Sequence, residues 1–234
     1  TYWRTMFAYE DMLCKGRVYL TKLKQRNRSL EKKSNQLMII IAEGRKLMSE
    51  SGGIFSMREL ARRLDVSPSG LYRYVANKRE LWYAIVIEDF KLFTQGFRLI
   101  HDKYIGTISF VELITKIGVF FLEFAKTNYE KFNLMFLSNP PSSKKESGEF
   151  ERSMNSEALD ILYSIVSKAV LAKEIINQNP KHLTLSYWSY ILGSAILLSP
   201  TYEYLHSDTF LGKGTKSDYE HFIVNMINTL FVNK

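Results

Sequence analysis

Residues 56–81 read SMRELARRLDVSPSGLYRYVANKREL, and this stretch decides the fold. Apolar residues recur in it at helical spacing, a turn interrupts them, and a proline follows the turn. The pattern predicts two short helices joined by a tight turn and followed at once by a third helix. This is the layout of a helix-turn-helix that reads a specific DNA duplex site. The alternative is a small helical hairpin with ordinary exposed basic residues.

The helix ends in this stretch carry recognisable signals. Ser56 and Glu59 have the spacing of a capping box. Asp65 falls at the turn, in a position that favours residues tolerating a left-handed backbone. Ser67 suits the N-cap of the next helix, and Pro68 suits its first position, where a missing N–H costs nothing. These signals place the second helix just after residue 67.

The second helix carries side chains suited to DNA. A recognition helix presents its N-terminal residues to base edges in the major groove. Ser69 and Gly70 are small enough to let the backbone come close, and Arg73 is able to fork onto guanine. Tyrosine and capping serine hydroxyls suit phosphate oxygens, and Lys78 adds a positive charge at a helix N-terminus.

Residues 71–81, LYRYVANKREL, resemble the hallmark L-Y-x-[YH]-[FV]-x-x-K-x-x-L of the TetR family of transcriptional regulators. The clear match covers Ile54 to about Ile87, and a fainter one reaches back to about Ser34. Asp65, where many relatives carry glycine, and about thirty extra N-terminal residues depart from the family pattern. The resemblance implies that three residues hold the DNA backbone, namely Ser56, Ser67 and Lys78. It also implies that a further set lies near bases or phosphates, namely Arg58, Pro68, Ser69, Gly70, Tyr72, Arg73 and Tyr74.

The distribution of charge supports DNA binding independently. Residues 1–80 carry 17 Lys and Arg against 8 Asp and Glu, a net charge of +9. Residues 81–234 carry 15 against 16, a net charge of −1. All of the chain's charge of +8 therefore accompanies the predicted DNA reader, and binding should depend strongly on salt.

Composition favours a cytoplasmic protein with a packed core. The chain has 234 residues, 46% of them hydrophobic. Its single cysteine, Cys14, excludes a disulfide framework within the chain and fits a reducing compartment. The charged and apolar residues mixed at its start do not resemble a signal peptide. Residues 183–202 are uncharged, but their serines, glycine and proline make a membrane span a poor expectation.

Beyond residue 80 the periodicity is helical throughout, so the expected fold class is all-α. Helices are predicted at 81–103, 108–128, 129–137, 149–176, 180–199 and 217–232. The expected domains are a basic extension (1–33), a helix-turn-helix domain (34–80) and a helical effector-binding and dimerisation domain (81–234).

The resemblance implies a homodimer held by the last two helices, which form a four-helix bundle with the partner's pair. One isolated reader contacts too few bases for specific affinity, which also favours a dimer. The alternative is that these helices simply pack within one chain. The predicted interface comprises Trp188, Leu192, Gly193, Ala195, Ile196, Phe222, Ile223, Met226 and Leu230.

The middle of the chain is rich in aromatic residues, which suggests a cavity for a small lipophilic effector such as an acyl chain or a planar aromatic compound. Ordinary core packing is the alternative. Lys116, Glu112 and Glu123 are the charged residues able to orient a head group, unless they face water. The predicted pocket comprises Phe93, Phe97, Phe120, Phe121, Phe124, Tyr163 and Trp188. Repression relieved by the effector is the mode of action that the resemblance implies.

Two further hypotheses concern the extension and the competing functions. Lys24, Arg28 and Lys32 lie four residues apart, so a helix would align them beside the DNA or in solvent. No metalloprotease, zinc, phosphate-loop or nucleophile-elbow motif is present, so no catalytic residue, metal or cofactor is expected. A DNA-binding or architectural protein without an effector remains the alternative function.

Overall fold

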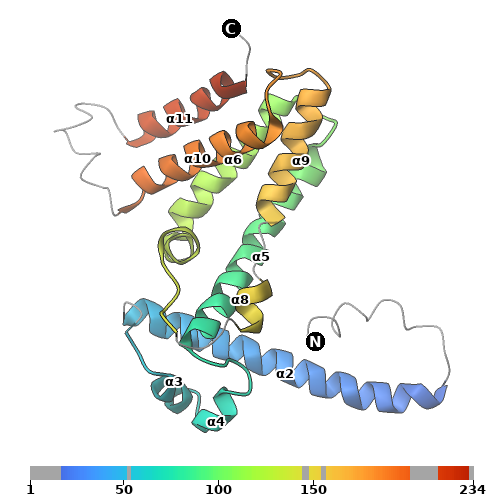
Figure 1. Cartoon of the computed structure of the whole chain (residues 1–234), viewed down its shortest axis with the longest axis vertical. Coiled ribbons are helices and arrows are strands. Elements are labelled where there is room, and N and C mark those ends of the chain that lie inside the picture. The colour runs from blue at the N-terminus through green and yellow to red at the C-terminus, as the bar shows by residue number, and fades with distance from the viewer. Residues whose placement is uncertain (1–16, 52–53, 144–147, 154–156, 201–215, 232–234) are drawn as a thin grey trace. The chain divides into compact units, whose positions relative to one another are not determined.

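The computed structural model describes residues 17–51, 54–143, 148–153, 157–200 and 216–231. Every regular element in these ranges is a helix, which confirms the all-α class (Figure 1). The chain divides into two compact units, Thr1–Ala76 and Asn77–Lys234. None of the described helices is long and apolar enough to cross a membrane.

The first unit contains α2 (Arg17–Glu50), α3 (Met57–Arg63) and α4 (Pro68–Leu71). Its core is a set of fully buried aliphatic side chains contributed by all three helices and the residues after α4, namely Ile40, Ile41, Leu47, Leu60, Ala61, Leu71 and Val75. The expected boundary at residue 33 lies inside α2, which continues without a break from the basic extension.

An ion-pair cluster joins α3 to α2. The Arg63 guanidinium lies 2.8 Å from a Glu50 carboxylate oxygen and 3.3 Å from one of Glu43. The two acids are two helical turns apart on α2, so they lie on the same side of it. The hydrogen bond from Arg63 lowers the pKa of Glu50 below its ordinary value. Arg63 therefore serves the packing of the unit.

The second unit begins with a long helix capped by Asn77, whose side chain accepts a 2.9 Å hydrogen bond from the Glu80 N–H. Its elements are α5 (Lys78–Tyr104), α6 (Phe110–Thr127), α7 (Tyr129–Phe132), the π-helix η1 (Asn133–Leu137), α8 (Glu149–Ser153), α9 (Glu157–Leu171), α10 (Pro180–Leu197) and α11 (Lys216–Phe231). The helix predicted over 149–176 is thus wrong as a single element. Its second part ends at Leu171 because Lys173 adopts a left-handed backbone with φ of +60°.

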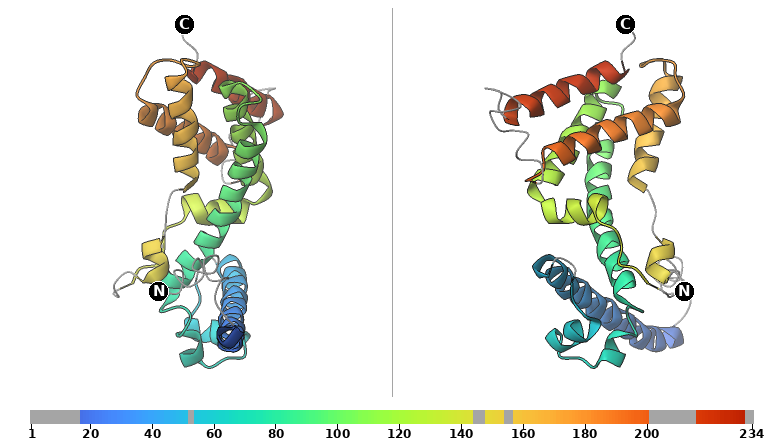
Figure 2. Two further views of the ribbon diagram at one scale, coloured as in Figure 1. Left: turned by 90° about the vertical axis from the view of Figure 1, so that its right-hand side faces the viewer. Right: turned by 60° about the vertical axis from the view of Figure 1, so that its left-hand side comes forward.

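Helix α6 is the centre of the second unit. It packs against α5, α9, α10 and α11 (Figure 2). Ser109 and Glu112 form both hydrogen bonds of a capping box at its start. Gly118 lets α10 come close, because a side chain there would overlap the Tyr187 hydroxyl. That hydroxyl donates a 2.9 Å hydrogen bond to the Ile114 carbonyl, and burial raises the pKa of Tyr187.

Helix α8 is bound to the first turns of α5 by polar contacts. The buried Glu80 carboxylate accepts a 3.0 Å hydrogen bond from the Phe150 N–H. Glu151 receives two hydrogen bonds from the Arg79 guanidinium and one of 3.1 Å from the Tyr83 hydroxyl. These contacts raise the pKa of Arg79. They join segments about seventy residues apart in sequence.

Candidate DNA-binding interface and effector site

The helix-turn-helix is built from local caps. The Ser56 hydroxyl accepts a 3.1 Å hydrogen bond from the Glu59 N–H, which forms the serine half of the predicted capping box. Asp65 has φ of +52°, as expected for a left-handed turn residue. The Ser67 hydroxyl then caps α4 by accepting a 3.1 Å hydrogen bond from the Gly70 N–H, and Pro68 occupies the first position. The regular part of α4 is only four residues long, and residues 72–74 continue it as turns.

The residues predicted to contact DNA lie mostly on the surface of the first unit. Ser56, Arg58, Ser67, Pro68, Ser69, Tyr72 and Arg73 are exposed, whereas Gly70 and Tyr74 are half-buried. The Tyr72 side chain is 47% exposed, so its ring and hydroxyl are accessible to a partner. Neither Arg58 nor Arg73 forms an ion pair with another described residue. Both guanidinium groups therefore keep their donors available for an external anion.

Lys78 is the first residue of α5, where the helix dipole favours anions. The residue is half-buried, and desolvation lowers its pKa. It thus combines a positive charge with a helix N-terminus, as the sequence predicted. Its predicted role in holding a phosphate remains a prediction.

In the second unit, most of the predicted effector residues form one aromatic cluster. Phe93 is fully buried, and its ring centroid lies 4.8 Å from that of Phe97, 4.9 Å from Phe124 and 5.5 Å from Phe121. Other members join through further ring contacts, so the aromatic cluster comprises Phe90, Phe93, Phe97, Phe120, Phe121, Phe124, Phe132, Phe136 and Trp188. Phe90, Phe132 and Phe136 belong to the aromatic-rich middle of the chain noted from the sequence, but the predicted pocket did not include them. The four-residue spacing of the last two indicates one helix face.

Tyr163 does not belong to this cluster, and its assignment to the pocket needs correction. It lies on the outer side of α9 with 39% of its surface exposed. The buried residues of that helix, which face the core instead, include Leu162, Ile165 and Val166. The tyrosine therefore falls on the solvent side of an amphipathic helix.

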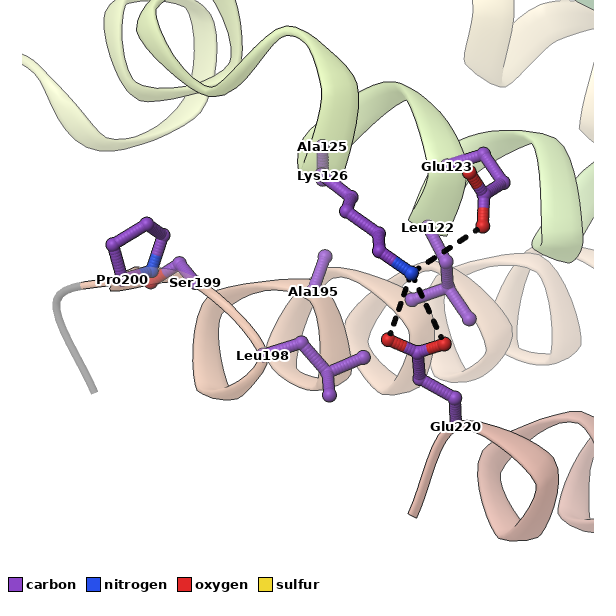
Figure 3. Close-up of a pocket in the computed structure, with 9 residues that line it drawn as sticks. All are labelled: Leu122, Glu123, Ala125, Lys126, Ala195, Leu198, Ser199, Pro200 and Glu220. Atoms are coloured by element: carbon purple, nitrogen blue, oxygen red, sulfur yellow. Dashed lines mark hydrogen bonds and ion pairs between the residues drawn. The ribbon is translucent and has the colours of Figure 1, made fainter. Parts of the chain in front are cut away.

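A separate small cavity of about 80 Å³ lies between α6, α10 and α11. Figure 3 shows the Lys126 ammonium between the carboxylates of Glu123 and Glu220, at distances of 3.9 and 3.4 Å. Leu122, Ala195 and Leu198 form the apolar side of the cavity. The ion pair with Glu220 links α6 to α11.

The predicted dimer residues divide between two environments. Ala195 and Ile223 are buried within the chain, so these two assignments need correction. Trp188 is half-buried, with its ring centroid 5.3 Å from that of Phe121, and its place in an interface stays a prediction. The others are at least partly accessible and are called the outward α10–α11 residues: Leu192, Gly193, Ile196, Phe222, Met226 and Leu230. A side chain added at Gly193 would meet open space, and Phe222 is 55% exposed. The sequence could not separate the two sets because apolar residues are spread around α10 without one dominant apolar face.

Among the described residues, no three His, Cys, Asp or Glu side chains are grouped so that they could hold a metal ion. An all-helical chain with this reader and a larger helical unit has the architecture of a DNA-binding transcription regulator.

Residues 40–85 match the family model described as bacterial regulatory proteins of the tetR family. The resemblance noted from the sequence is therefore confirmed over this segment. A comparison with curated proteins found no match.

Solved structures share the fold over most of their length. A TetR/AcrR-family transcriptional regulator from Thermobifida fusca is 21% identical with a TM-score of 0.56, covering 82% of this chain and 96% of that one. FadR from Bacillus subtilis in complex with stearoyl-CoA is 13% identical with a TM-score of 0.57, covering 81% and 96%. AibR in complex with isovaleryl coenzyme A and operator DNA is 18% identical with a TM-score of 0.57, covering 81% and 96%.

Proposed function

We propose that the chain is a ligand-responsive transcriptional repressor that binds a palindromic operator as a homodimer and is released by a small lipophilic effector. The exposed recognition segment carries this proposal. Ser67 and Pro68 fix the start of α4, while Tyr72 and Arg73 are presented on the surface, and Arg73 has no ion pair with another described residue. An arginine so placed makes bidentate contacts to guanine, worth about 1–3 kcal/mol each in discrimination between bases.

The outward α10–α11 residues support the homodimer. Large apolar groups such as Phe222 and Leu192 are costly to leave in water when they gather on adjacent helices. Gly193 allows a partner helix to approach closely. Two-fold symmetry then places two recognition helices on a palindromic site.

The aromatic cluster supports a lipophilic effector. Its rings touch one another across α5, α6, η1 and α10, so an apolar ligand inserted among them would change the spacing of these helices. Two structures with the same fold hold acyl-CoA ligands, which makes an acyl chain the first class to test. The effector must bind the DNA-incompetent state more tightly, and a tenfold loss of operator affinity needs about 1.4 kcal/mol of coupling.

Selection of duplexes from a random-sequence library by the purified protein tests the proposal, followed by affinity measurements on the best site. We expect a palindromic site. Tyr72→Ala/Arg73→Ala should weaken binding to it at least tenfold, since a bidentate arginine–guanine pair is worth about 1–3 kcal/mol.

The matched control is Tyr163→Ala/Lys168→Ala, which removes an exposed tyrosine and one positive charge from α9. This variant should bind the site as the wild type does. Enrichment of no defined site, or equal binding by the recognition variant, would contradict the assignment of α4 as the reader.

Dimerisation is tested with Gly193→Glu and, as control, Ser186→Glu on the exposed N-terminal half of the same helix. Sedimentation of the Gly193 variant should show monomers, because a buried unpaired carboxylate opposes association. A dimer of unchanged stability would exclude this part of α10 from the interface.

A further inference from the structure

Side chains of α5 and α6 pair across the contact between the two helices, from the aromatic cluster to the C-terminal end of α5. This row of paired side chains is called the α5–α6 seam. Phe124 lies against Phe93 with centroids 4.9 Å apart, and Phe120 lies against Phe97 with centroids 5.7 Å apart. The next pair in the seam is Lys116 of α6 with Tyr104 of α5, with 4.8 Å between the ammonium and the ring centroid.

A second ammonium stands at the same ring. Lys103 Nζ lies 5.0 Å from the centroid of Tyr104, so two positive charges from two helices meet at one aromatic side chain. Neither lysine forms an ion pair with another described residue. The neighbouring carboxylates are engaged, since Asp102 contacts His101 and Glu112 caps α6. This end of the seam therefore offers two cations to an anion.

Phe120 separates the cationic end from the buried cluster. Its ring is half-buried and rests on Gly96, where any side chain would overlap it. Glycine inside a helix costs about 1 kcal/mol relative to alanine, so the space that Gly96 leaves for the Phe120 ring lowers the stability of α5. A rotation of Phe120 away from Gly96 would open the seam between Tyr104 and the fully buried Phe93.

From these contacts we infer that the α5–α6 seam binds an amphipathic anion, with its head group between Lys103 and Lys116 and its linear apolar tail under Phe120 against Phe93. Phe93 and Tyr104 are about 16 Å apart along the helix axis. A medium-length alkyl chain spans this separation and a short one does not. This inference rests on the proposed effector response. It adds the chemical class of the ligand and the two lysines that bind its charged head group. The shared chemistry is a carboxylate or phosphate on an alkyl chain.

Calorimetric titration of the full-length protein tests the inference, with each probe kept below its micelle threshold. The probes are dodecanoate, dodecyl phosphate, dodecanoyl-CoA and uncharged dodecanol. Lys103→Gln/Lys116→Gln keeps most of each side chain and removes both charges. We expect this variant to bind the anionic probes at least tenfold more weakly than the wild type and to bind dodecanol equally well.

The control variant is Lys168→Gln/Lys181→Gln, which removes two exposed lysines from α9 and α10. It should bind every probe as the wild type does. Dodecanoate and dodecyl phosphate bound without dodecanoyl-CoA would identify a free amphiphile as ligand, whereas preference for dodecanoyl-CoA would identify the thioester with its phosphates.

Equal losses for dodecanol and the anions, or no loss in the lysine variant, would overturn the head-group assignment. Wild-type protein that binds none of the probes would overturn the inference itself. The proposed operator binding is judged separately by its sensitivity to Tyr72→Ala/Arg73→Ala, so the two failures are distinguishable.

Discussion

Asp65 holds a left-handed backbone in the turn between α3 and α4, with φ of +52°. This conformation costs an ordinary L-residue about 1–2 kcal/mol, and aspartate bears it better than most. Asp65→Gly should therefore raise the free energy of unfolding by up to about 1 kcal/mol, after allowance for the flexibility of glycine in the unfolded chain. Asp65→Val should lower it by about 1–2 kcal/mol, because a β-branched residue fits this region poorly. Urea denaturation measures both.

Asp160 provides the control for this comparison. It is exposed in the first turn of α9, where its charge and helical backbone are favourable. Asp160→Gly should destabilise the protein, opposite in sign to Asp65→Gly. The same sign at both positions would mean that backbone strain at Asp65 is not the cause.

Tyr187 makes a second residue-scale prediction. Its buried hydroxyl donates to the Ile114 carbonyl across the contact of α10 with α6. Tyr187→Phe keeps the ring and removes the hydrogen bond, and we expect a loss of about 1 kcal/mol, or about 2–4 °C in the melting temperature. Tyr163→Phe, at an exposed position, should leave the melting temperature unchanged.

Residues with local partners were predictable from the sequence, and those with distant partners were not. The caps at Ser67 and Asn77 bond within three residues of themselves, so their spacing in the sequence predicts them. The partners of Arg63 lie in another helix, and no local pattern distinguishes it from Arg58. The contact of Trp188 with Phe121 was not predictable, because apolar residues are spread around α10 and their spacing does not reveal which side of the helix faces the core.

At the scale of elements, the attachment of α3 to α2 depends on ionised Glu50. Arg63 lowers the pKa of Glu50 from its ordinary value of 4.5. A carboxyl whose pKa is lower in the folded state contributes stability above its unfolded pKa and loses it as the pH falls through the folded value. The wild type should exceed Glu50→Gln in thermal stability at neutral pH. The difference should begin to shrink as the pH falls below about 4.5 and should vanish once the pH is below the folded-state pKa of Glu50.

Glu31→Gln is the matched control, since Glu31 is exposed on the same helix. Melting curves of this variant should follow the wild type across the same pH range. A Glu50 difference that persists in acid would assign the effect to packing of the side chain rather than to its charge.

At the scale of the whole molecule, the basic extension continues directly into the reader through α2. Lys24 and Arg28 are one turn apart, whereas Lys22 and Arg26 lie about 200° round the helix from them. If the first pair binds phosphates, Lys24→Gln/Arg28→Gln should reduce the slope of log affinity against log salt by about 0.9 for each phosphate that is no longer neutralised. Lys22→Gln/Arg26→Gln removes the same charge from the other side and should change the slope less. Equal slopes for the wild type and both variants would mean that these side chains of the extension face solvent and do not bind phosphates.

The central place of α6 governs how the folded protein opens. Amide protons of buried helices exchange with solvent only when the whole unit unfolds, whereas those of small peripheral elements exchange through local opening. Ile114 and Ile117 of α6 are fully enclosed by neighbouring helices, but α8 is five residues long and is held through a few side chains. In deuterium oxide, α8 should take up label long before α6. Glu151→Gln should speed labelling of α8, because it weakens the hydrogen bonds from Arg79 that hold this helix against α5. The slow amides of α6 should be unchanged, because they exchange only when the whole unit unfolds.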